Sequence, residues 1–171
     1  MARLLVVGEY HLGDSVNKIC EGSLVMQAPE QKDENEDEGV SSKDSDKEKE
    51  ENDRPCPRLI FGTVSGMIGV VISLPESDFN VLKLLQKAMK EVIKGIGGLS
   101  HSEWRSFSND YRKMPKVSTG FIDGDLVELF LDPYVTSKTR DKIMKLVNKD
   151  GKNALKEDEV FSLVRKLSRM H

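Results

Sequence analysis

A change of hydrophobic period at Pro75 constrains the fold of this chain more than any other feature. Before it lie two short apolar runs, Arg58 to Val64 and Met67 to Leu74, separated by Ser65 and Gly66. Such a two-residue Ser-Gly break predicts a β-hairpin, because glycine supplies the positive φ of a tight turn. After the proline, apolar residues recur every three or four positions, which indicates a helix with one buried face. The sequence therefore predicts a sheet that ends here and helices that follow.

The first predicted helix spans residues 75–94 and carries its apolar side chains on one face. These are Phe79, Leu82, Leu85, Met89, Val92, Ile93 and Ile96. Ser73 or Ser77 is expected to cap the helix, and the glycines at 95–98 are expected to end it. If Phe79 is buried as this face predicts, Phe79→Ala should cost about 3–5 kcal/mol.

Three further strands are predicted upstream of the hairpin, over residues 3–12, 15–20 and 23–27. Turns at Gly13-Asp14 and Glu21-Gly22 separate them. Short strands at intervals of roughly ten residues are typical of sandwiches and propellers. They have no obvious partner sheet in this sequence, so we expect the strands to be part of a larger β structure.

The back half predicts a compact array of further helices, each with apolar residues at helical spacing. Ser100 and Glu103 form a capping box that opens a short helix carrying Trp104, an expected core residue. The next helix starts at Asp123 or Gly124 and ends at Asp132. Its inward residues are expected to be Leu126, Leu129 and Phe130.

Two longer helices complete the predicted array. One starts at Thr136 or Ser137 and ends at Asn148, and the other spans residues 156–169. In the latter, Val160, Leu163, Val164 and Leu167 lie on one stripe. The predicted fold class is therefore α+β, with strands in residues 1–74 and an all-helical region in residues 75–171.

Acidic charge is concentrated in one insert within the strand region. Residues 30–53 contain 12 acidic residues and four lysines, whereas the whole chain has a net charge of −3. The insert, taken as residues 28–57, is too poor in apolar residues to offset its ordering cost and is predicted to be disordered. An acidic interaction segment or a phosphorylation site at Ser41, Ser42 or Ser45 is the functional alternative.

Composition argues against several classes of function. The chain outside the insert is only mildly and evenly basic, which does not predict a nucleic-acid groove. Two cysteines, Cys20 and Cys56, in a chain without a recognisable signal peptide favour a reduced intracellular protein. No apolar run approaches the length of about 18 residues that spans a membrane.

No candidate catalytic or metal centre has the spacing that its chemistry requires. His11, His101 and His171 lie far apart in the sequence and beside no second ligand, which argues against a metal site. The segment 150–159 lacks the ligands and the glycine of a calcium loop. Asp123 and Asp125 could form an acid pair, but they are interpreted as caps and dipole partners at a helix start. No catalytic residue or cofactor is predicted.

A further three glycines, Gly62, Gly66 and Gly69, are not spaced as a phosphate-binding loop, and no Lys-Ser or Lys-Thr follows them. Turn geometry and close packing within a sheet explain them better. The residue patterns alone therefore predict a non-enzymatic chain.

Several motifs add a resemblance to a known family. They are Gly8-Glu-Tyr-His-Leu-Gly13, the blocks 61–70 and 99–107, Gly120-Phe-Ile-Asp-Gly-Asp-Leu126, and the closing pattern from Leu167 to His171. Together they resemble the C-terminal region of the family that includes the large subunit of the UV-damaged-DNA-binding complex, the adaptor of a cullin-RING ubiquitin ligase. A cleavage and polyadenylation factor subunit and a splicing-factor subunit share this region.

The resemblance implies the last blade strands of a β-propeller followed by a small helical C-terminal domain. It also implies a scaffold in DNA repair and protein ubiquitination, with ubiquitin ligase components or the rest of the propeller as partners. Association with damaged DNA would be indirect, and the expected location is the nucleus, with the cytoplasm as the alternative. The alternatives are a protein-interaction subunit in splicing or polyadenylation and an independent nucleic-acid-binding module.

Overall fold

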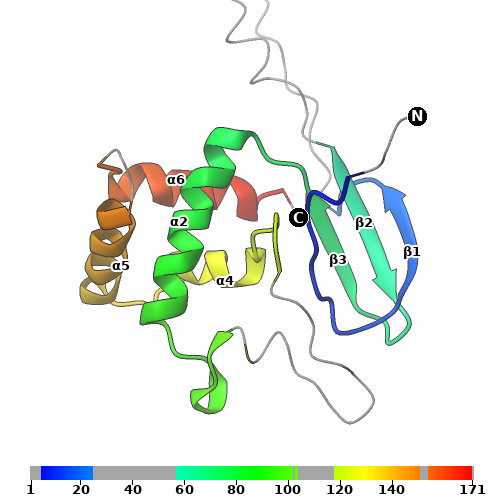
Figure 1. Cartoon of the computed structure of the whole chain (residues 1–171), viewed down its shortest axis with the longest axis horizontal. Coiled ribbons are helices and arrows are strands. Elements are labelled where there is room, and N and C mark those ends of the chain that lie inside the picture. Colours follow the sequence, from blue (N-terminus) through cyan, green and yellow to red (C-terminus); the bar gives the residue numbers. More distant parts are fainter. Residues whose placement is uncertain (1–4, 25–56, 102, 104–117, 151–153, 171) are drawn as a thin grey trace, which may run out of the picture.

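The computed structural model of the chain describes residues 5–24, 57–101, 103, 118–150 and 154–170, without the side chains at 96 and 150. Three strands come first: β1 (Val16–Glu21), β2 (Arg58–Thr63) and β3 (Ile68–Ile72). The helices α2 (Glu76–Val92), α4 (Gly124–Glu128), α5 (Ser137–Asp150) and α6 (Glu157–Ser168) follow, with short 3-10 helices η1 (Ile96–Gly98) and η2 (Leu129–Leu131). The sheet and the helices occupy opposite sides of the molecule, so the α+β class is confirmed (Figure 1).

The sheet is antiparallel with the order β1-β2-β3. β2 and β3 form the predicted hairpin, in which Phe61 pairs with Gly69, and Gly66 has a φ of 90° in the turn. β1 pairs with the other edge of β2, with a register shift between Val16 and Lys18. The predicted strand at 15–20 is therefore confirmed as β1, and the hairpin is confirmed with both strands slightly shorter than predicted.

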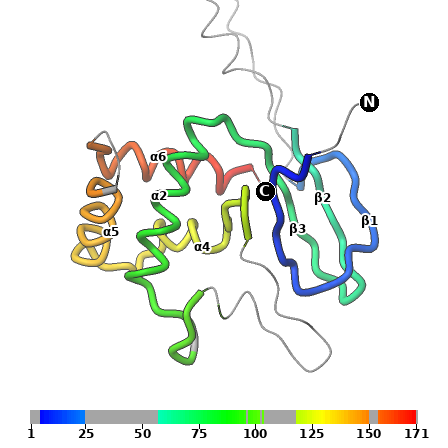
Figure 2. The backbone as a smooth tube through the Cα atoms, in the orientation of Figure 1, coloured from blue at the N-terminus to red at the C-terminus, as the bar shows by residue number. Residues whose placement is uncertain are grey.

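The predicted strand at residues 3–12 is wrong for the residues that the structure describes. Residues 5–12 form an extended arm, whose sole ladder contact is an isolated bridge between Glu9 and Thr119. The arm is not a strand of the described sheet, because Glu9 pairs instead with the segment that precedes α4. Leu5, Val6 and Val7 stay exposed. Figure 2 traces the arm, in dark blue, as it leads into β1. Most of the predicted strand at 23–27 lies outside the described residues, and Ser23 and Leu24 are not in a strand.

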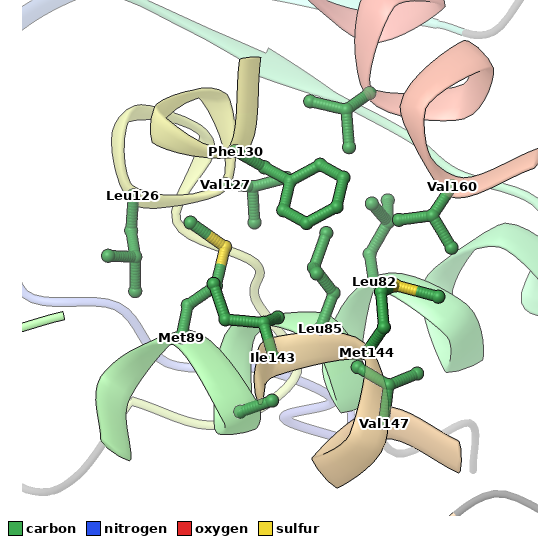
Figure 3. Close-up of a cluster of buried hydrophobic side chains, with 12 residues drawn as sticks. Leu82, Leu85, Met89, Leu126, Val127, Phe130, Ile143, Met144, Val147 and Val160 are labelled. Carbon is green, nitrogen blue, oxygen red and sulfur yellow. The ribbon is translucent and has the colours of Figure 1, made fainter. Parts of the chain in front are cut away.

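One hydrophobic core holds the helices together (Figure 3). Its buried members come from α2, α4, η2, α5 and α6: Leu82, Leu85, Ala88, Met89, Leu126, Val127, Phe130, Ile143, Met144, Val147, Val160 and Val164. Each helix contributes the apolar residues of one face, as the periodicity predicts. The sheet has only two buried residues among those described, Phe61 and Thr63.

Three details of the predicted helix packing are wrong. Phe79 is only half-buried, and Leu129 is 38% exposed while its neighbour Val127 is buried instead. Neither Ser73 nor Ser77 caps α2, because Pro75 occupies the N-cap position and makes no side-chain hydrogen bond there. Apolar spacing therefore identifies a helix face, whereas the edge of that face depends on neighbouring helices.

Other sequence predictions fall partly outside the described residues. The Ser100–Glu103 capping box is confirmed, with the Glu103 amide donating to Ser100 Oγ at 3.2 Å and the Ser100 amide donating to Glu103 at 2.7 Å. These bonds lower the pKa of the Glu103 carboxyl, chiefly through the Ser100 hydroxyl. Trp104 and His171 lie outside the described residues. So does the acidic insert, including Cys56, apart from its last residue, Pro57.

Candidate interaction surface and its junction with the helices

The sheet presents apolar side chains on both of its faces. The register places Ile19, Phe61 and Leu59 on one face, with Ile60 and Ile68 on the other. Ile19, Leu59 and Ile68 are 60%, 41% and 65% exposed. Strands that are apolar on both faces are typical of sheets covered on both sides. This sheet is therefore suited to burial between two other layers.

Strand β1 is an open edge of this sheet. All six of its residues are exposed, and Cys20 has a free, exposed thiol. An exposed edge strand presents unpaired backbone groups that can pair with another strand. The two apolar faces and the β1 edge together are called the open sheet below.

A carboxylate ties the turn before β1 to the hairpin turn. Asp14 accepts hydrogen bonds from the Ser65 hydroxyl, from the Ser65 amide at 3.1 Å and from the Ser15 amide at 2.7 Å. These bonds, the Ser65 hydroxyl first, lower the pKa of the Asp14 carboxyl below its ordinary value. They favour the charged form and fix the two turns at one end of the sheet.

A second carboxylate joins the arm to the helices. Asp123 is 5% exposed, and its Oδ2 accepts a hydrogen bond from the Tyr10 hydroxyl at 2.9 Å. His101 Nε2 lies 2.9 Å from the same oxygen, and the Asp123 amide donates to Gln86 Oε1 on α2 at 2.6 Å. Asp123 therefore connects the arm, the helical residue His101, α2 and the start of α4, and this group of contacts is called the Asp123 junction below.

Close backbone packing accompanies the Asp123 junction. Glu9 and Thr119 exchange two backbone hydrogen bonds of 2.8 and 2.9 Å, and the rings of Tyr10 and Phe121 lie 5.6 Å apart. Gly120 has a φ of 72°, and a Cβ there would clash with the backbone of the arm. Only glycine permits this approach without strain.

The interpretation of Asp123 as a helix cap is wrong for its side chain. Asp123 occupies the N-cap position of α4, but its side chain makes no capping bond because it binds Tyr10 and His101 instead. Sequence reasoning missed this group, since Tyr10 and Asp123 are 113 residues apart. A signal existed: three of the motif blocks that carry the family resemblance each contain one member of the group.

Other candidate residues stay apart or lie outside the described part of the chain. In the described ranges, no group of three or more His, Cys, Asp or Glu side chains is arranged to hold a metal ion. None of the helices in those ranges is both long and apolar enough to cross a bilayer. Segment 151–153 of the rejected calcium loop is not described.

Comparison with known proteins identifies the family. A family model described as the CPSF A subunit region matches residues 1–132. The chain belongs to the CPSF A subunit family. The matched region of this CPSF A family chain includes the arm, the sheet, α2, α4 and all members of the Asp123 junction.

Several curated relatives of this CPSF A family chain are plant proteins. DNA damage-binding proteins 1b and 1a of Arabidopsis thaliana are 41% and 40% identical to it over 170 and 169 residues. DNA damage-binding protein 1 of Oryza sativa subsp. japonica is 38% identical over 169 residues. Each alignment covers 99% of this chain but 13% of the relative, so the chain spans about an eighth of the length of these proteins.

Proposed function

We propose that this chain is a non-catalytic scaffold segment that resembles the end of a cullin-RING ubiquitin ligase adaptor. In this proposal, residues 1–74 are terminal propeller strands interrupted by the insert at 28–57, and residues 75–171 are a helical C-terminal domain. The open sheet is the observation that carries the proposal. Propeller blades are small sheets arranged around a channel, and each is covered by its neighbours.

The partner of the open sheet is the remainder of a propeller, whether it comes from further sequence or from another polypeptide. Apolar side chains such as Ile19 and Ile68 leave water when neighbouring blades cover them, which drives the assembly. The assembled scaffold holds ubiquitin ligase components during DNA repair in the nucleus, and its association with damaged DNA is indirect. The similarity to DNA damage-binding proteins supports the link to DNA damage in this proposal.

A role in mRNA processing is the second candidate. The family description, CPSF A subunit region, motivates it, whereas identities of 41% and 40% to DNA damage-binding proteins over 99% of the chain support the first candidate. The same open sheet would then hold subunits of a splicing or polyadenylation complex. Both candidates use the open sheet as the docking surface, and they differ in the proteins that the assembled complex contains.

Affinity purification of the tagged chain from nuclei tests the proposal. Co-purification of a cullin and its RING subunit is expected. Ile19→Lys and Ile68→Lys each place a charge on one face of the open sheet and should abolish this recovery. Tyr134→Lys is the matched control, because Tyr134 is 93% exposed on the turn between η2 and α5, and its replacement leaves the sheet unchanged.

Different outcomes separate the candidates. Recovery of splicing or polyadenylation factors in place of the cullin would favour the second candidate. Direct binding of purified chain to DNA with a steep salt dependence would favour a nucleic-acid-binding module. Recovery that is equal for the wild type and both sheet variants would show that the open sheet is not the docking surface.

A further inference from the structure

We propose that the Asp123 junction is a releasable clasp that fixes the sheet on the helices, and that opening it frees the sheet while the helical core stays folded. The proposal is independent of which partner covers the open sheet. It rests on how Asp123 is placed among four segments that are distant in sequence.

The clasp depends on a buried carboxyl group that needs hydrogen-bond partners. A polar side chain as buried as that of Asp123 is costly unless hydrogen bonds compensate it. Tyr10 supplies one donor from the arm, and His101 lies at the same distance from the same oxygen. The arm is therefore held by a polar contact at Tyr10. Its apolar residues Leu5, Val6 and Val7 are exposed and bury little apolar surface.

The helical side of the clasp is anchored separately. The Asp123 amide donates to Gln86, whose helix α2 contributes Leu82, Leu85 and Met89 to the core. Removing the Tyr10 hydroxyl leaves this backbone bond and the core contacts unchanged. The arm can thus be released without removing any member of the helical core.

The position of the arm determines the position of the sheet. Residues 11–15 lead directly from the arm into β1, and the short segment 73–75 leads from β3 into α2. In the described ranges, the extensive contacts between elements are strand on strand or helix on helix, and any contact between a strand and a helix is weak. The sheet is therefore attached to the helices chiefly by segment 73–75 and by the arm, so the clasp is the attachment that can open.

Hydrogen exchange in the intact chain tests the clasp. Tyr10→Phe keeps the ring against Phe121 but removes the hydroxyl, and it should speed exchange of the Glu9 and Thr119 amides roughly tenfold or more. Asp123→Asn keeps the hydrogen bond from the backbone amide of residue 123 to Gln86. It should likewise speed exchange of the Glu9 and Thr119 amides. Amides of the buried helices, such as Leu85 and Val147, should keep their protection.

Matched controls separate the clasp from the general loss of a hydroxyl or a charge. Tyr134→Phe removes a hydroxyl from a tyrosine that is 93% exposed, and Asp141→Asn removes an exposed carboxylate of α5. Neither should change exchange at Glu9 or Thr119. Unchanged exchange at these amides in Tyr10→Phe and Asp123→Asn would overturn the proposal. Equal acceleration throughout the helices would also overturn it, because the junction would then support global folding alone.

A distance measurement tests the consequence for the sheet. Spin labels at the exposed Cys20 of β1 and at Lys145→Cys of α5, in a Cys56→Ser background, report the separation of sheet and helices. Adding Tyr10→Phe should broaden the distance distribution, whereas adding Tyr134→Phe should leave it narrow. A distribution that stays narrow with Tyr10→Phe would show that the arm does not position the sheet.

Discussion

At the scale of single residues, the pair of Phe61 and Gly69 shows how the sheet retains one buried aromatic ring. The two residues face each other across β2 and β3, and a Cβ built on Gly69 would overlap the Phe61 ring. The missing side chain therefore makes room for the ring, as the sequence interpretation of close packing at Gly69 predicts. Gly62 differs, because a Cβ there would meet no atom within 4 Å.

Gly69→Ala should lower the free energy of unfolding by about 1–3 kcal/mol, because the added methyl group forces the Phe61 ring to move. Urea denaturation monitored by far-UV circular dichroism measures the change. Gly62→Ala is the matched control and should be close to neutral, since its Cβ would enter open space. Equal effects of the two substitutions would contradict this account of Gly69.

Asp14 should make stability depend on pH in the acid range. Hydrogen bonds from Ser65 lower the native pKa of its carboxyl, so its contribution to stability is complete above the ordinary pKa of about 3.9 and is lost as the pH falls toward the native value. The stability difference between the wild type and Asp14→Asn should therefore be larger at pH 6 than at pH 3. Urea denaturation at both values measures it, and a difference independent of pH would refute the role of the carboxylate.

The Asp123 junction marks the limit of sequence reasoning at this scale. The local sequence pattern correctly places Asp123 at the start of α4, but it predicts that the Asp123 side chain caps this helix. The true partners, Tyr10 and His101, approach only after the arm has docked, and no local periodicity encodes that contact. Only the observation that three motif blocks of the resemblance each carry one of Tyr10, His101 and Asp123 points toward it.

At the scale of elements, local patterns identify β1, the hairpin and the four longer helices correctly. Their hydrophobic periods are set by the geometry of a strand or a helix, so the sequence alone determines them. The arm was missed because an alternation of apolar residues describes a strand only when a partner strand is available. Which residues lie at the edge of a buried face, such as Phe79 and Leu129, depends on packing between helices.

Leu85→Ala should destabilise the helices by about 2–5 kcal/mol, because Leu85 is fully buried in the shared core. Phe79→Ala should cost clearly less than the 3–5 kcal/mol expected for a buried phenylalanine, because Phe79 is only half-buried. Thermal denaturation followed at 222 nm compares the two variants. A larger loss for Phe79→Ala than for Leu85→Ala would contradict the packing of α2.

At the scale of the whole molecule, burial is distributed unevenly. The helices share one core of 12 buried residues, whereas the sheet leaves apolar side chains exposed on both faces. This asymmetry agrees with the sequence prediction that the strands have no obvious partner sheet in this chain. The exposed faces of the sheet agree with the finding that the chain matches only 13% of a much longer relative.

Residues 1–74 expressed alone should fail to fold as a stable monomer. The open sheet would keep its exposed faces and its β1 edge, and it would lose the attachment to the helices, which favours aggregation. Analytical ultracentrifugation and thermal denaturation of this fragment measure the outcome. A monomeric fragment that unfolds cooperatively would contradict the prediction.

The pairing of β1 with β2 has a practical consequence for protein engineering. The ends of these strands are joined by the pairing of Glu21 with Leu59 and by a hydrogen bond of 3.1 Å from the Gly22 amide to the Arg58 carbonyl. Whatever sequence connects them starts and finishes at neighbouring points, and doubling its length costs only about 0.6 kcal/mol of closure entropy. The connection is therefore a natural place to graft an epitope or a fluorescent reporter while the strand register on either side is preserved.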